Sequence, residues 1–278
     1  MSYVQRSRER SACGSGNPFP EFQIFLQPIV DLKRSSVFAY EALCRGLGGE
    51  HYPDLVTQVD QALMPAFDEL IMITELRLAA KLRLEDRGVK ISLNMGPTSG
   101  LSQAHVVREA KRLKIKPSSI MIELTEGVRM DPEKLARIIV DHRAAGVVVA
   151  LDDFGAGYAG LNVLGTCVPD VLKIDGELIR NIHSSPLKKT IVGAFASVCR
   201  TLKVEIIAEG VETIAEVGAL QRLGINLMQG YFFAHPQAWE APQVNFSFGY
   251  RKTSLTKESK WPRISKADRE WLRKAIRQ

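Results

Sequence analysis

Short apolar runs, each ending in a polar residue, recur along the middle of the chain. One of them is Val147-Val148-Val149-Ala150-Leu151, which leads directly into Asp152 and Asp153. Apolar runs of this length, bounded by turn residues, are typical of buried strands. The pattern predicts strands at residues 22–30, 37–43, 89–94, 119–124, 147–152, 170–174, 204–208 and 226–229.

Segments with apolar residues three and four positions apart lie between most of these strands, a spacing that is typical of helices with one buried face. Asp131-Pro132 marks one helix start, because aspartate caps a helix and proline suits its first turn. Strands that alternate with helices pair in parallel. The pattern predicts two helical stretches within 53–84 and helices at 102–113, 131–144, 186–202 and 213–223.

The polar residues at the strand ends are regularly spaced. Their mean interval from Glu41 to Gln229 is (229 − 41)/6, about 31 residues, which is close to one strand–helix unit of a (β/α)8 barrel of about 250 residues. We therefore predict an α/β fold, a single-domain TIM-like (β/α)8 barrel with its active site at the C-terminal ends of the strands. An open doubly wound sheet is the alternative, but such sheets usually gather their site at one switch point.

In a barrel the strand ends converge on one mouth. Carboxylate and amide oxygens there suit hard cations such as Mg²⁺ or Mn²⁺. The adjacent Asp152 and Asp153 repel each other unless a cation neutralises them, and one of them can bridge two metals. The residues expected at the mouth are Glu41, Asn94, Glu123, Asp152, Asp153, Lys173, Glu209 and Gln229.

Lys173 lies between the core residues Leu172 and Ile174, where burial of a charge needs a partner or a purpose. We interpret it as a group that holds the attacking water or stabilises charge on a phosphate. A salt bridge to Asp153 or Glu209 without a chemical role is the alternative.

The 278 residues suffice for one barrel, and 45% of them are hydrophobic. Residues 251–278 carry ten Lys/Arg and three Asp/Glu, a net charge of +7, so the other 250 residues sum to −1. We expect a flexible leader at 1–20, the barrel domain at 21–245 and a basic tail or helix at 246–278. Packing of that tail on the barrel is favoured over binding to nucleic acid.

No membrane span is expected. The cysteines, with no metal-type spacing, are expected to be free thiols in a cytoplasmic protein.

Several short motifs follow one another along the chain. One is Glu41-Ala42-Leu43 followed by Arg45. The others are Gln27-Pro28-Ile29-Val30, Asn94, Glu123-Leu124-Thr125-Glu126, Asp152-Asp153-Phe154-Gly155, Leu172-Lys173-Ile174-Asp175, Ala208-Glu209-Gly210-Val211-Glu212, and Gln229-Gly230-Tyr231 with Pro236. Together these motifs resemble the EAL-domain cyclic-di-GMP phosphodiesterases, and Glu41-Ala42-Leu43 is similar to the signature of that family. The resemblance covers roughly residues 21–240.

The resemblance implies hydrolysis of cyclic di-GMP to linear pGpG with two Mg²⁺ or Mn²⁺ ions per site. It implies that Glu41, Lys173 and Glu209 are catalytic and that Glu126 anchors the loop 154–160. The metal ligands that it implies are Glu41, Asn94, Glu123, Asp152, Asp153 and Glu209. The substrate-binding residues that it implies are Gln27, Leu43, Arg45, Asp175, Glu212, Gln229 and Pro236.

The loop Ala156-Gly157-Tyr158-Ala159-Gly160 departs from the family pattern, while no implied ligand is lost. The alternative function is a catalytically silent EAL-like receptor that binds cyclic di-GMP or a protein partner. The expected partners are cyclic di-GMP and a second copy of the chain, and a regulatory protein partner is left open.

Overall fold

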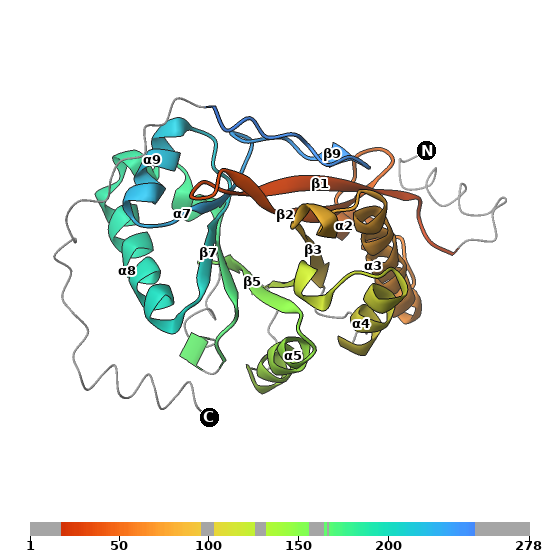
Figure 1. Ribbon diagram of the computed structural model, residues 1–278. Helices are drawn as coiled ribbons and strands as arrows, with labels where there is room; N and C mark the ends of the chain where they lie inside the picture. Colours follow the sequence, from red (N-terminus) through yellow and green to blue (C-terminus); the bar gives the residue numbers. More distant parts are fainter. Residues whose placement is uncertain (1–17, 96–102, 126–131, 156–163, 166, 248–278) are drawn as a thin grey trace, which may run out of the picture.

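The computed structural model describes residues 18–95, 103–125, 132–155, 164–165 and 167–247. Its centre is a closed sheet (Figure 1), in which the strand order is β2-β3-β4-β5-β6-β7-β8-β1 and β1 pairs back onto β2. A two-residue strand, β9, pairs with β1. The strands are β1 Phe22–Asp31, β2 Ser36–Gly46, β3 Lys90–Met95, β4 Ile120–Thr125, β5 Val148–Phe154, β6 Val171–Ile174, β7 Glu205–Ala208, β8 Leu227–Gln229 and β9 Gln237–Ala238.

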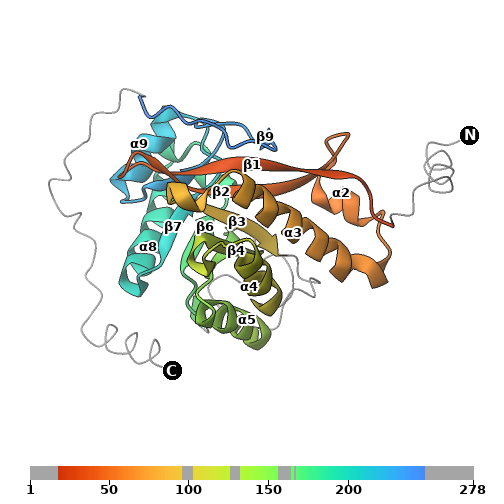
Figure 2. The ribbon, with the colours of Figure 1, turned by 45° about the vertical axis from the view of Figure 1, so that its right-hand side comes forward.

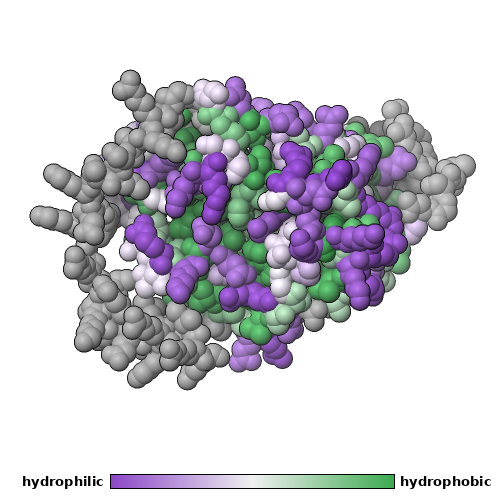
Figure 3. Space-filling model, in the orientation of Figure 1, coloured by the Kyte–Doolittle hydropathy of each residue, from purple (hydrophilic) through white to green (hydrophobic). Residues whose placement is uncertain are grey.

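Helices surround this barrel, as the turned view shows for α3, α4, α5 and α8 (Figure 2). Each predicted helix is confirmed within a few residues. Figure 3 shows hydrophilic side chains gathered over α3 and α4. None of the helices in the described part of the chain is both long and apolar enough for a bilayer span. The helices are α2 Tyr52–Val56, α3 Met64–Lys81, α4 Gln103–Arg112, α5 Pro132–Ala144, α7 Gly176–Ile179, α8 Pro186–Leu202 and α9 Ile214–Arg222, with short 3-10 turns η1 Gln61–Leu63, η2 Glu85–Arg87, η3 Pro117–Ser119 and η4 Ile182–Ser184.

The barrel differs from the predicted parallel pairing at one strand. Pairing is parallel from β2 to β8, but β1 is antiparallel to both β2 and β8. Only residues 32–35 separate β1 from β2, and so short a link permits a hairpin but not a parallel crossover. The carboxylate of Asp31 accepts hydrogen bonds from the backbone N–H groups of Lys33 and Arg34, which fixes that turn.

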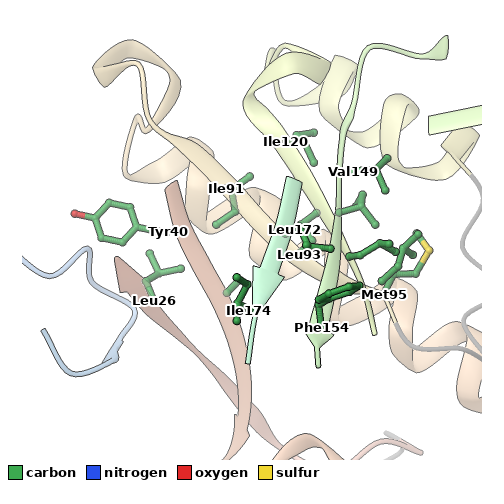
Figure 4. Close-up of a cluster of buried hydrophobic side chains, with 14 of the residues drawn as sticks. Leu26, Tyr40, Ile91, Leu93, Met95, Ile120, Val149, Phe154, Leu172 and Ile174 are labelled. Carbon is green, nitrogen blue, oxygen red and sulfur yellow. The ribbon is translucent and has the colours of Figure 1, made fainter. Parts of the chain in front are cut away.

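The buried apolar residues form two layers, one on each side of the strands. The outer layer packs the strands against the helices, and Figure 4 shows part of it. The inner layer is a separate cluster from seven strands: Ile29, Ala39, Met121, Ala150, Val171, Ile207 and Leu227. Members of the two layers alternate along the strands that contribute to both, as in Val149, Ala150 and Leu151 of β5. The inner cluster therefore fills the barrel.

The predicted domain boundaries stay predictions. Residues 1–17 and 248–278, which contain most of the expected leader and tail, lie outside the described residues, as do Glu126 and the loop residues 156–160.

Candidate active site

The pleat of the strands determines which side chains enter the mouth of the barrel. Side chains two residues apart on a strand point to the same face. On the parallel strands, the residue two positions beyond an inner apolar residue therefore also points into the barrel. On five of these strands, and directly after β7, that residue is one of the predicted site residues: Glu41, Glu123, Asp152, Lys173, Gln229 and, after β7, Glu209.

Lys173 lies at the centre of this upper layer and is 1% exposed. Its Nζ is 2.5 Å from Glu123 Oε2, 2.8 Å from Glu209 Oε1 and 3.0 Å from Asp152 Oδ1. Glu41 Oε2 is 3.6 Å away. The salt bridge from Lys173 to Glu209, which the alternative interpretation named, is present. The aspartate that pairs with Lys173 is Asp152, and not Asp153 as that alternative named.

One lysine does not neutralise four carboxylates, and the pKa values reflect this imbalance. Burial and then the charge of Glu41 raise the pKa of Glu123 to about 8, although Lys173 opposes the shift. Burial likewise raises the pKa of Glu209 well above its ordinary value. Burial alone would lower the pKa of Lys173, but Glu123, Glu209 and the other carboxylates raise it, so the lysine stays charged. The layer therefore favours additional cations.

Amide side chains surround Glu41 and fix its two oxygens. Asn94 Nδ2 donates to Glu41 Oε1 at 3.1 Å and to the carbonyl oxygen of Ala42 at 3.2 Å. Gln229 Nε2 donates to Glu41 Oε2 at 2.5 Å and to Gln27 Oε1 at 3.2 Å. The buried Gln229 Oε1 has no hydrogen-bond partner among the described residues. The predicted residues Gln27, Glu41, Asn94 and Gln229 are thus brought together.

Ser92 is a site residue that the sequence prediction missed. Its hydroxyl donates to Glu123 Oε1 at 2.5 Å and is fully buried. Ser92 lies on β3, which contributes no residue to the inner apolar cluster. The available signal was its place two residues before Asn94, on the same face of the strand.

A β-bulge explains how two consecutive aspartates serve one site. The pairing of β5 with β6 shifts between Leu151 and Phe154, so β5 contains an extra residue there. Asp153 has a φ of 55°, in the left-handed region. Bulges re-aim side chains, and backbone strain of this kind clusters at functional sites. Carboxylate oxygens of Asp152, Asp153 and Glu209 consequently lie within 4.8 Å of one another, a geometry that fits a metal ion.

The remaining predicted substrate-binding residues make no hydrogen bond to the carboxylates of this cluster in the described part of the chain. Asp175 caps α7 by accepting from the N–H of Glu177 at 2.8 Å. Arg180 pairs with Glu212 at 3.4 Å, and Arg45 contacts His51. Leu43 and Pro236 are partly buried, and Glu126 lies outside the described residues. Their substrate-binding and loop-anchoring roles stay predictions.

Two curated proteins of Escherichia coli are similar to this chain in sequence. The blue light- and temperature-regulated antirepressor BluF of Escherichia coli is 31% identical over 222 residues, which are 78% of this chain and 55% of BluF. The cyclic di-GMP phosphodiesterase PdeF of the same organism is 33% identical over 227 residues, 78% of this chain and 30% of PdeF. The chain thus spans about a third to a half of these relatives.

Solved structures give the same family. A standalone EAL protein of Vibrio cholerae with bound c-di-GMP has a TM-score of 0.77 and 34% identity, and the match covers 85% of this chain and all of that one. The manganese and cyclic di-GMP complex of Klebsiella pneumoniae BlrP1 has a TM-score of 0.73 and 32% identity, over 81% of this chain and 58% of BlrP1. The family model of the EAL domain matches residues 17–236. The chain belongs to the EAL domain family.

Proposed function

We propose that this protein is a metal-dependent phosphodiesterase that hydrolyses cyclic di-GMP to linear pGpG. The observation that supports it most is the set of four carboxylates around Lys173, with Asp152, Asp153 and Glu209 close enough for a metal ion. PdeF, which is named a cyclic di-GMP phosphodiesterase, and the BlrP1 complex with manganese and cyclic di-GMP support the same substrate and cofactor class.

The donors at the mouth fit two divalent cations, Mg²⁺ or Mn²⁺. The oxygens of Glu41, Asn94, Glu123 and Asp152 would hold one ion, and those of Asp152, Asp153 and Glu209 the other. The raised pKa of Glu123 and the unpartnered Gln229 Oε1 indicate charge and hydrogen-bonding capacity that the protein leaves unsatisfied. Two such ions, when bound, activate water and neutralise charge on the phosphodiester.

The protein groups act by position and charge. Lys173 holds Glu123, Asp152 and Glu209 in one cluster. In this proposal its ammonium group also positions the attacking water. Gln229 and Asn94 hold Glu41 in its orientation. Arg45, with its planar guanidinium, is suited to a substrate phosphate. Gln27, Leu43, Asp175, Glu212 and Pro236 complete the substrate-binding set in this proposal.

The test is hydrolysis of cyclic di-GMP by purified protein with Mg²⁺ or Mn²⁺. Wild type is expected to produce pGpG, and both a chelator and Glu41→Ala are expected to abolish it. Glu205→Ala, which removes an exposed glutamate at the start of β7, is the matched control and is expected to retain activity. Turnover that survives chelation or Glu41→Ala would contradict the proposal.

A silent receptor is the second candidate, because the relative BluF is named an antirepressor. Under this alternative the protein binds cyclic di-GMP, or a regulatory protein partner, without hydrolysis. Calorimetric binding of cyclic di-GMP with no pGpG in the presence of Mn²⁺ would favour it.

The proposal includes a homodimer in the cytoplasm. Two exposed apolar side chains on α8, Leu187 at 70% and Val198 at 38% exposure, support contact with a second copy. Cys44, Cys167 and Cys199 are free thiols, which persist in a reducing compartment. Sedimentation of wild type and of the double variant Leu187→Lys, Val198→Lys tests the dimer. A dimer mass that is unchanged in the double variant would contradict this interface.

A further inference from the structure

Glu216, in the first turn of α9, is a buried carboxylate outside the cluster around Lys173. Its Oε1 accepts from the backbone N–H of Asn181 at 2.7 Å. Its Oε2 accepts from the backbone N–H groups of Glu212 and Thr213, both at 3.0 Å. A carboxylate that accepts hydrogen bonds from three N–H groups stays ionised, because such bonds are strong and favour its charged form.

These three N–H groups come from two different loops. Asn181 lies between α7 and η4, in the segment that follows β6. Glu212 and Thr213 lie in the segment that follows β7. Burial alone would raise the pKa of Glu216, but the N–H groups of Asn181, Glu212 and Thr213 lower it, so the carboxylate stays ionised. One side chain thus joins the loops that follow two neighbouring strands of the barrel.

The second of these loops contains the site residue Glu209. The N–H of Glu209 donates to the carbonyl of Ile174 at 3.1 Å, and the N–H of Val211 donates to the carbonyl of Gln229 at 3.0 Å. The two loops also touch through glycines, since a Cβ added at Gly210 would lie 3.0 Å from the Cα of Gly176. A shift of either loop therefore moves the other.

We propose that Glu216 is a positioning residue: its carboxylate clamps the loop after β6 to the loop after β7 and so holds Glu209 beside Lys173 and the two aspartates. The consequence for turnover rests on the proposed function, whereas the clamp itself can be measured without substrate. Residues that orient metal ligands from outside typically change metal affinity about 10- to 100-fold when replaced.

The competing explanation is an ordinary helix cap. Thr213 Oγ1 accepts from the N–H of Glu216 at 3.3 Å, and the two residues form a capping box. Thr213→Ala removes the threonine half of that box and leaves the bond between Glu216 and Asn181. It is the matched control, because both variants weaken the start of α9 and only Glu216→Ala releases the loop after β6.

The experiment compares wild type, Glu216→Ala, Glu216→Gln and Thr213→Ala by amide hydrogen exchange, without metal or substrate. The clamp predicts exchange at the amides of Glu209 and Val211 at least about tenfold faster in Glu216→Ala than in Thr213→Ala, as expected when a local opening becomes easier. Glu216→Gln keeps one acceptor oxygen and is expected to fall between wild type and Glu216→Ala. If Glu216→Ala does not fold, Glu216→Gln against Thr213→Ala gives the same comparison.

Calorimetric titration with Mn²⁺ alone is the second measurement. We expect about tenfold weaker binding in Glu216→Ala and near-wild-type binding in Thr213→Ala. Equal exchange at Glu209 and Val211 in the two variants would overturn the clamp. If exchange is faster in Glu216→Ala but wild type does not hydrolyse cyclic di-GMP, the clamp is supported and the proposed function is rejected.

Discussion

Two neighbouring layers inside the same barrel have opposite chemistry. The lower layer consists of apolar side chains such as Ala39, Met121 and Val171. The upper layer, two residues further along the same strands, contains Glu41, Glu123 and Lys173. Each of the strands β2, β4 and β6 runs through both layers. Position along the strand, relative to the mouth, therefore separates the part of the barrel that supplies packing from the part that supplies charge.

The two layers also differ in what they need in order to be stable. Apolar side chains gain from burial alone, at about 25 cal/mol per Å². Buried charges require partners, and removal of one partner leaves the others uncompensated. Ser92 joins the layers, because it is paired with Met121 of the lower layer on one side and with Glu41 of the upper layer on the other, and its hydroxyl donates to Glu123. The predictions that follow test this division between packing and charge.

The largest effect is expected from Lys173→Met. Loss of the cation leaves four carboxylates without their shared partner, and we expect about 3–5 kcal/mol less stability in metal-free protein. Urea unfolding measures it, and hydrolysis of cyclic di-GMP should also be lost. Lys203→Met, at an exposed lysine that ends α8, is the control and should change stability by less than about 0.5 kcal/mol. A loss below about 1 kcal/mol in Lys173→Met would contradict the central role of the lysine.

In the lower layer, Met121→Ala is expected to reduce stability by about 3 kcal/mol through the cavity that it leaves. Met121 is fully buried and belongs to no polar network. Activity per folded molecule should change little, since no charge moves. Unfolding curves and a hydrolysis assay below the melting temperature measure the two quantities. A large drop in kcat with unchanged stability would show that the layers are not separate.

The charge layer should make metal-free protein less stable as pH rises. Burial and the charge of Glu41 raise the pKa of Glu123 to about 8, so the folded state binds a proton that the unfolded state releases near its ordinary value of 4.5. This contribution is present below pH 4.5 and is lost as pH rises through about 8, with a slope of up to about 1.4 kcal/mol per pH unit. Glu75 and Glu209, whose pKa values burial also raises, act in the same direction.

Unfolding of wild type and of Glu123→Gln, both with a chelator, between pH 5 and about pH 8 measures the slope of stability against pH. The slope should be shallower in the variant. Saturating Mn²⁺ should also reduce it, because bound cations favour the ionised carboxylates. If the free energy of unfolding of wild type, minus that of Glu123→Gln, increases with pH over this range, the raised pKa of Glu123 is contradicted.

The smallest effect is expected from Ser92→Ala. It removes one hydrogen bond to Glu123, and we expect about 1–2 kcal/mol less stability together with a measurable fall in activity. Ser119→Ala, at a 3-10 turn outside the barrel, is the control. A fall in stability without any change in activity would mean that Ser92 serves packing only.

Much of this site could be predicted because strands have a period of two. The apolar runs located the strands, and the polar residue after each run indicated Glu41, Glu123, Lys173 and Glu209. The antiparallel direction of β1 was not predicted, although the short link at 32–35 contained the signal. Ser92 was missed because a single serine inside an apolar strand looks like any buried hydroxyl, and only its partner, Glu123, reveals its role.

The sequence alone predicted the barrel, the positions of its strands along the chain and the identity of most charged groups at its mouth, because periodicity and strand ends are local properties. Tertiary structure decided which groups touch. It placed Lys173 among four carboxylates, bent β5 so that Asp152 and Asp153 share one site, and joined two loops through Glu216. Such contacts join residues that are distant in the chain, so they depend on how the barrel closes and not on any local pattern.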